Sequence, residues 1–197
     1  MLGQVEETGL APSRVRRAAV AAAALIGLVA AAVAAPHAPV RTATLADIRS
    51  EIAARRGAPL LVNFWASWCA PCVAEMPDLG RAESRFSAHH LKVLGVSVDL
   101  FVSDDGAPLR SRIADLLDRA KVGYTNLLYT GTQDPLAEAF GLLGVLPSSI
   151  LYGSDGREIK CWVGPVTLDE IASALGPARK GGSKAFSHPI PARAVPR

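Results

Sequence analysis

The sequence predicts an α/β domain in which a central mixed sheet has helices on both faces. Short apolar runs typical of buried strands alternate with amphipathic stretches through the middle of the chain. The alternation ends in a tight-turn hairpin and a closing helix, which adds antiparallel strands to the sheet. Half of the 197 residues are apolar, enough to bury one good core. One domain with appendages is therefore expected.

The domain is expected at residues 45–176. It begins with a helix at residues 45–52, whose apolar residues recur at helical spacing and which ends near Gly57. Residues 59–65, Pro-Leu-Leu-Val-Asn-Phe-Trp, are short, apolar and rich in β-formers, which predicts a buried central strand. Helical spacing resumes after this strand and predicts a second helix, with Pro77 inside it.

The second half of the domain continues the alternation. Further strands are expected at residues 91–98 and 124–129, and further helices at residues 109–120 and 135–140. A hairpin follows, with strands at residues 150–152 and 157–163 joined by a Ser-Asp-Gly turn. Thr167 and Glu170 have the spacing of a capping box, which predicts the start of a last helix that ends near residue 175.

Residues 1–35 are expected to be a targeting segment outside the fold. Three arginines precede an uncharged, alanine-rich run at residues 18–35, which is the pattern of a signal peptide. The run also has about the minimum length of a membrane span, so a retained membrane anchor is an equal alternative. In both cases the basic flank stays in the cytoplasm and the domain is exported, to the periplasm or another extracytoplasmic compartment.

The linker, the C-terminal tail and the net charge give no sign of a nucleic-acid partner. Residues 36–44 are expected to form a linker, and residues 177–197 a disordered basic tail rich in Pro and Gly. The formal net charge of +3 is small and dispersed, so nucleic acid is not an expected partner. Membrane contact is expected only through the N-terminal segment.

Cys69 and Cys72 carry the clearest chemical signal in the chain. They are two residues apart, where the central strand gives way to a helix. Cys69 is therefore expected at a helix N-terminus, where free N–H groups and the helix dipole favour a thiolate. This predicts a reversible dithiol–disulfide site. A permanent structural disulfide or a metal pair is the alternative, although the adjacent His89 and His90 lack the spacing of zinc ligands.

The third cysteine, Cys161, is left over from this pair. It lies in a predicted strand and is expected to be a buried, inert residue, with a third redox cysteine as the alternative.

The residues around the pair resemble a known family. Residues 63–72, Asn-Phe-Trp-Ala-Ser-Trp-Cys-Ala-Pro-Cys, resemble the active-site segment of the thioredoxin superfamily, and residues 73–77, Val-Ala-Glu-Met-Pro, are similar to its extracytoplasmic TlpA/ResA-like branch. Residues 144–151 are similar to the segment that carries a cis proline, here Pro147, facing the dithiol. The resemblance spans about residues 59–175 and implies the thioredoxin fold.

The resemblance implies a role for each site residue. Cys69 would be the attacking nucleophile and Cys72 the resolving thiol. Glu75 would tune proton transfer at the cysteines, because Asn63 stands where thioredoxin carries a buried aspartate; an exposed helix glutamate is the alternative. Pro147 would offer its neighbouring backbone to substrate. Substrate contacts are expected at Trp68, Ala70, Pro71, Leu146 and Gly164. Core packing is the alternative for Trp68, and a plain turn glycine the alternative for Gly164.

The implied function is an exported thiol–disulfide oxidoreductase that reduces disulfides of selected exported proteins. No organic cofactor and no metal are expected, and a membrane partner would supply electrons. Cytochrome c maturation and oxidase copper-site assembly are typical tasks of this branch. The main alternative is a Cu(I)-binding chaperone that uses Cys69 and Cys72 as soft ligands. Peroxide reduction would need a Thr-x-x-Cys setting, which is missing.

Overall fold

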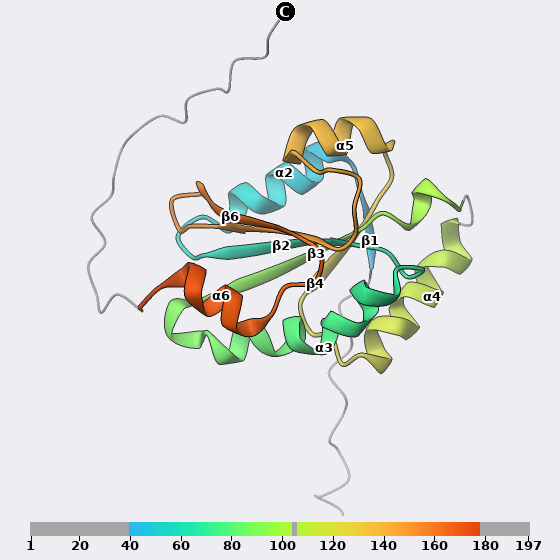
Figure 1. The fold of residues 1–197 in the computed structure, drawn as a ribbon. Helices are drawn as coiled ribbons and strands as arrows, with labels where there is room; N and C mark the ends of the chain where they lie inside the picture. Colours follow the sequence, from blue (N-terminus) through green and yellow to red (C-terminus); the bar gives the residue numbers. More distant parts are fainter. Residues whose placement is uncertain (1–39, 104–105, 178–197) are drawn as a thin grey trace, which may run out of the picture. The chain divides into compact units, whose positions relative to one another are not determined.

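The computed structural model describes residues 40–103 and 106–177 (Figure 1). The expected targeting segment at residues 1–35, and the expected tail at residues 177–197 except for its first residue, lie outside these ranges. Within the two ranges, no helix has both the length and the apolar character needed to span a bilayer.

One mixed sheet of six strands forms the centre of the described domain. The strands are β1 (Arg41–Ala43), β2 (Leu60–Trp65), β3 (Lys92–Ser97), β4 (Thr125–Tyr129), β5 (Ser148–Tyr152) and β6 (Glu158–Val163). Their order in the sheet is β1-β4-β3-β2-β5-β6. The first four run parallel to one another, and β5 and β6 complete the sheet in antiparallel pairs. This confirms the predicted mixed sheet.

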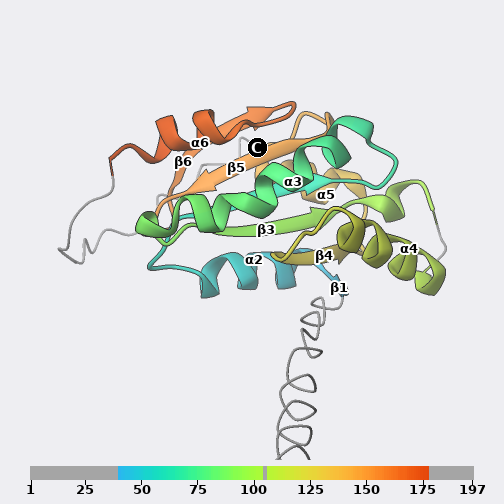
Figure 2. The same cartoon turned by 90° about the horizontal axis from the view of Figure 1, so that it is seen from below.

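Helices cover both faces of the sheet. They are α2 (Leu45–Ala54), α3 (Ala70–Arg85), α4 (Gly106–Arg119), α5 (Gln133–Phe140) and α6 (Leu168–Leu175). Figures 1 and 2 show α2 and α5 on one face and α3, α4 and α6 on the other. Contacts agree with this arrangement, because the ring of Phe64 packs against Phe140 of α5 while the neighbouring Asn63 bonds to Glu75 of α3.

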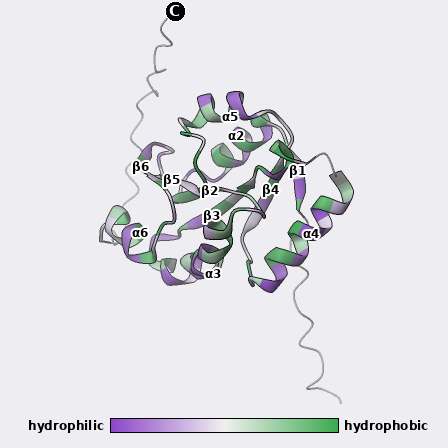
Figure 3. Cartoon of the chain, turned by 45° about the vertical axis from the view of Figure 1, so that its right-hand side comes forward, coloured by the Kyte–Doolittle hydropathy of each residue, from purple (hydrophilic) through white to green (hydrophobic). Residues whose placement is uncertain are grey.

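The core forms where the strands are apolar on both sides. All six residues of β2 are buried, as expected for a central strand covered on both faces. Figure 3 shows hydrophobic and hydrophilic residues alternating around α4, whose buried Leu109, Ile113 and Leu117 recur every fourth residue. The predicted capping box is confirmed at α6, where Thr167 and Glu170 each accept a hydrogen bond from the other's backbone.

The expected linker at residues 36–44 is wrong in part, because it contains β1. This strand pairs in parallel with β4, and the backbone N–H of Thr130 donates to Ala43 O at 3.0 Å. Only the last of its three residues is buried, so β1 has no alternation that could reveal a strand. Contacts made at a distance in the sequence hold it in place.

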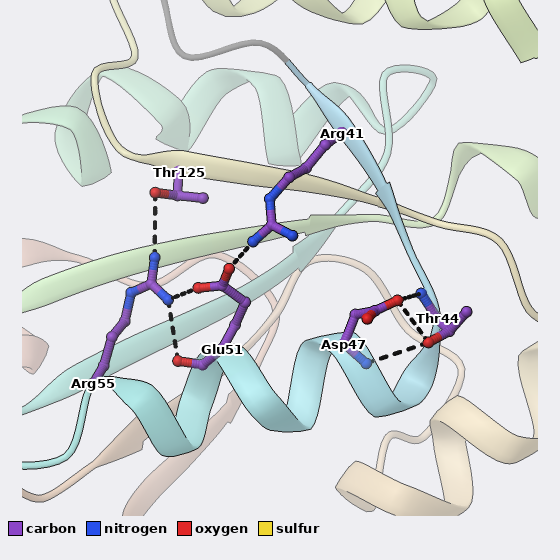
Figure 4. Close-up of polar contacts among 6 residues, drawn as sticks. All are labelled: Arg41, Thr44, Asp47, Glu51, Arg55 and Thr125. Atoms are coloured by element: carbon purple, nitrogen blue, oxygen red, sulfur yellow. Dashed lines mark hydrogen bonds and ion pairs between the residues drawn. The ribbon is translucent and has the colours of Figure 1, made fainter.

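Figure 4 shows those contacts at the start of the domain. Arg41 of β1 and Arg55 both form ion pairs with Glu51 of α2. Arg55 also donates to Thr125 of β4 at 3.3 Å. At the other end of α2, Asp47 closes a second capping box with Thr44. The helix thus links the edge strand to its neighbour in the sheet.

Candidate active site

The two cysteines lie at the junction between β2 and α3. Cys69 is the N-cap of α3 and has an extended backbone, and its sulfur accepts a hydrogen bond from the backbone N–H of Cys72 at 3.3 Å. The pair is joined by a disulfide, with Cα atoms 5.3 Å apart. Cys72 is 1% exposed and Cys69 6%. The N–H of Cys72 in the first turn is therefore directed at the sulfur of Cys69, the more exposed of the two cysteines, where it would stabilise a thiolate in the reduced chain.

Three side chains around the pair are open to solvent. Trp68 is 53% exposed, and Ala70 and Pro71 are exposed beside it. Trp68 is therefore not a core residue, and its indole is available to a partner. These are three of the five positions at which substrate contacts were expected.

Pro147 lies at the same edge of the sheet as the dithiol. The Leu146–Pro147 peptide is cis. Because β5 is antiparallel to β2 and Ser148 pairs with Phe64, Pro147 comes next to the end of β2 that leads to Cys69. Leu146 is half-buried, so part of its side chain remains open to solvent.

Gly164 forms a backbone hydrogen bond with the Pro147 loop. Its N–H donates to Pro147 O at 2.8 Å, so it is not free to bond a substrate. Its φ of 99° lies in the region that favours glycine, while a Cβ there would meet nothing. These observations favour the turn-glycine interpretation.

Glu75 is buried on α3, which excludes an exposed helix glutamate. Its two carboxylate oxygens accept hydrogen bonds from Asn63 Nδ2 at 2.8 Å and from Val166 N at 2.9 Å. Desolvation raises the pKa of the carboxyl, although both hydrogen bonds act in the opposite direction. The carboxyl can therefore take up a proton more readily than an exposed one, as a group that exchanges protons with the thiols must.

A row of polar residues crosses the sheet beneath α3. Ser149, Asn63, Gly95 and Asn126 are aligned in register on β5, β2, β3 and β4. Asn63 donates to Ser149 Oγ at 3.0 Å. Trp65 donates to Asn126 Oδ1 at 3.0 Å, across the position of Gly95. Of these residues, only Asn63 was predicted from the sequence to be part of the site; a polar residue inside an apolar strand run was the signal for Ser149 and Asn126.

Asp99 is a second buried acid that sequence analysis missed. It is 1% exposed and accepts hydrogen bonds from the backbone and hydroxyl of Ser67, just before Trp68. Its signal in the sequence is an aspartate that follows a buried strand at its carboxyl end. Neighbouring parallel strands end at the same edge of the sheet, so such a residue lies near the end of β2.

The expectation that Cys161 is buried is wrong. Cys161 lies on β6, an edge strand, and is exposed. It shares its side of the strand with Ile159 and Val163, which are also exposed, whereas Trp162 on the other side is buried. Desolvation and the charge of Glu158 raise the pKa of the Cys161 thiol.

Across the described ranges, no three His, Cys, Asp or Glu side chains gather closely enough to hold a metal ion.

Known proteins resemble this chain in sequence and in fold. The thiol-disulfide oxidoreductase ResA of Geobacillus thermodenitrificans is 28% identical over 120 residues, which cover 61% of this chain and 63% of the relative. The chain thus spans less than two thirds of that relative's length. A secreted thiol-disulfide isomerase from Corynebacterium glutamicum matches with a TM-score of 0.53 at 22% identity, over 63% of this chain and 72% of its own.

A thiol:disulfide interchange protein of the thioredoxin family from Chlorobium tepidum matches with a TM-score of 0.50 at 22% identity, over 62% of this chain and 81% of its own. The thioredoxin-like fold and the resemblance to that superfamily are therefore confirmed. The AhpC/TSA family matches residues 26–157, which include the dithiol, Glu75 and Pro147. Since this match covers more than half of the sequence, the chain belongs to the AhpC/TSA family.

Proposed function

We propose that the chain is a thiol–disulfide oxidoreductase that reduces disulfides in protein substrates through Cys69 and Cys72. The observation that carries the proposal is the placement of Cys69 as the N-cap of α3, with the N–H of Cys72 directed at its sulfur. The oxidoreductase name of the ResA relative also supports it.

The reaction has two exchange steps. The Cys69 thiolate attacks one sulfur of the substrate disulfide, forms a mixed disulfide and releases the other substrate sulfur as a thiolate. Cys72, after losing its proton, attacks Cys69 Sγ and releases the second substrate thiolate. Two electrons pass to the substrate and the Cys69–Cys72 disulfide is formed. A dithiol partner, which we place in the membrane, must then reduce it.

The surroundings of the pair supply binding and proton transfer. Trp68, Ala70 and Pro71 offer an exposed surface to the substrate, and Leu146 with the backbone at Pro147 borders it. Glu75 takes up the proton that leaves Cys72, because its desolvated carboxyl has a raised pKa. No organic cofactor is required, since the dithiol itself carries the electrons.

The domain works outside the cytoplasm in this proposal. The basic flank and the apolar run at residues 18–35 support export, with the run either cleaved or kept as a membrane anchor. Substrates are then exported proteins with disulfides, and cytochrome biogenesis is the task that the resemblance favours. Copper delivery and peroxide reduction lack a supporting observation in the described residues.

A trapping experiment tests the function. With Cys72→Ala in a Cys161→Ser background, the second exchange step is blocked, so the full-length chain should accumulate mixed disulfides through Cys69. The matched control is Cys69→Ala in the same background, which leaves the buried Cys72 and should trap little. An empty trap, or equal trapping by both variants, contradicts the proposed reaction. Capture of cytoplasmic proteins instead of exported ones contradicts the proposed location.

A further inference from the structure

We propose that Asp99 is a positioning residue that holds the Trp68–Cys69 segment ready for protein substrates. The inference rests on the proposed function and goes further, because it assigns substrate preference to a side chain outside the dithiol motif. The carboxylate of Asp99 bonds to Ser67 and Ser97 and to neither cysteine, so it acts on the cysteines through Ser67.

The carboxylate of Asp99 is fully engaged. Oδ1 accepts from the backbone N–H of Ser67 at 3.0 Å and from its hydroxyl at 2.5 Å. Oδ2 accepts from the same N–H at 3.1 Å and from the hydroxyl of Ser97 at 2.6 Å. Three donors thus make four contacts, two to each oxygen, because the Ser67 N–H is shared between the oxygens; these contacts fill the acceptor capacity of a carboxylate. Hydrogen bonds to a buried carboxylate are among the stronger ones in proteins.

These bonds join two strand ends. Ser97 is the last residue of β3, and Ser67 follows the end of β2 by two residues. Val98 N also donates to Trp65 O at 2.9 Å, so the segments that follow β2 and β3 stay side by side beyond the end of the sheet. The carboxylate therefore fixes the point at which the chain leaves the core on its way to the dithiol.

Trp68 depends on this fixed point. Ser67 lies between Ala66, which is fully buried, and Trp68, which is 53% exposed. Cys69 N donates to Ala66 O at 3.1 Å and closes a turn over Ser67 and Trp68. An indole that is half in solvent has little core packing to orient it, so its direction is set by this turn. Asp99 holds the turn and thereby presents Trp68.

The reaction of a small disulfide should be less sensitive to this presentation. A protein substrate covers the surface around the dithiol and uses Trp68, whereas a small aromatic disulfide needs mainly the Cys69 sulfur. Loss of the Asp99 contact should therefore raise KM for a protein substrate while kcat and the small-disulfide rate change little.

Asp99→Asn in the full-length chain tests the inference, with insulin as the protein disulfide and 5,5′-dithiobis(2-nitrobenzoate) as the small one. We expect KM for insulin to rise about tenfold, the equivalent of one charge-assisted hydrogen bond, and the small-disulfide rate to stay within about twofold. In a Trp68→Ala background, the same substitution should change KM for insulin by less than about twofold, because the two residues act in series.

Ser67→Ala covers the case in which Asp99→Asn does not fold, since it removes the hydroxyl contact and keeps the backbone one. It should raise KM for insulin in the same direction by less, and Ser67→Thr should restore it. Ser84→Ala is the matched control, because its hydroxyl bonds to Arg81 O on an exposed part of α3.

Two results would overturn the role of Asp99 but not the proposed function. One is that Asp99→Asn lowers activity equally with insulin and with the small disulfide. The other is that its effect on KM for insulin is fully additive with that of Trp68→Ala. A wild-type chain that reduces neither disulfide overturns the proposed function itself.

Discussion

Glu75 carries two opposing effects on one carboxyl group. Burial removes water from the carboxylate, whereas the donors on Asn63 and Val166 stabilise its charge. Desolvation is the larger effect, so the pKa is raised. A folded chain that binds this proton more tightly than the unfolded chain gains stability from protonation.

The stability linked to Glu75 should therefore fall with rising pH. It is complete below the ordinary pKa of 4.5 and is lost as the pH rises through the higher pKa of the folded chain. Glu75→Gln cannot titrate at this position. The difference between the free energies of unfolding of wild type and variant should therefore fall as the pH rises and then level off. Urea unfolding of both proteins from about pH 3 to pH 8 measures this difference.

Glu170 is the matched control with the opposite sign. Hydrogen bonds from Thr167 lower the pKa of its carboxyl in the folded chain. Its contribution is present above the ordinary pKa and is lost as the pH falls through the lowered one. The free energy of unfolding of wild type minus that of Glu170→Gln should accordingly rise with pH. A Glu75 difference that is independent of pH, or that rises as for Glu170, would contradict the assigned shift.

At the level of elements, β2, β3 and β4 are joined by side chains as well as by backbone. The bond from Trp65 to Asn126 passes over Gly95 on the intervening strand. A Cβ at Gly95 would lie 1.9 Å from Asn126 Oδ1 and 3.1 Å from Trp65 Nε1. The glycine is required there for close approach, not for an unusual φ.

Gly95→Ala should destabilise the domain by roughly 1–3 kcal/mol, because Asn126 must move and leave the buried indole N–H unpaired. The free energy of unfolding from urea titration measures the loss. Gly123→Ala is the matched control, since a Cβ at Gly123 meets nothing within 4 Å. It should change stability by about 0.5 kcal/mol or less. Equal losses of stability with the two substitutions would show that the Trp65–Asn126 hydrogen bond does not require a glycine at position 95.

The sequence predicted most elements because their signals are local. The apolar run of β2, the capping box of α6 and the turn between β5 and β6 each lie within a few residues. β1 was missed because its place depends on β4 and on the ion pairs of Glu51. The exposure of Cys161 follows from the position of β6 at the sheet edge, which only the assembled sheet reveals.

The candidate site divides in the same way. The dithiol and the cis Pro147 were predicted from short segments that resemble a known family. The bonds of Asn63 to Ser149 and of Ser67 to Asp99 join residues 86 and 32 positions apart. No spacing in the sequence encodes such pairs. A polar residue within or just after an apolar strand indicates that a partner exists, but not which one.

At the scale of the whole domain, the topology gathers the site at one edge of the sheet. β2 and β3 are parallel and end together at Trp65 and Ser97, while antiparallel β5 begins beside them at Ser148. The dithiol, Asp99 and Pro147 each lie just beyond one of these strand ends. Chemistry at the carboxyl ends of parallel strands is a common result of this arrangement.

The domain also contains a reference thiol, Cys161, against which a reactive thiolate at Cys69 can be measured. Cys161 is exposed and Cys69 is 6% exposed, so accessibility alone favours Cys161. The thiolate populations act in the other direction, since partial desolvation and the charge of Glu158 raise the pKa of Cys161. A helix N-terminus favours the thiolate form of a cysteine at its N-cap, which is the position of Cys69.

Alkylation of the fully reduced, full-length chain by iodoacetamide at neutral pH, followed peptide by peptide by mass spectrometry, compares the two directly. We predict that Cys69 is modified at least about tenfold faster than Cys161, because its thiolate is the more populated of the two at that pH. A Cys69 that reacts no faster than Cys161 would contradict the account.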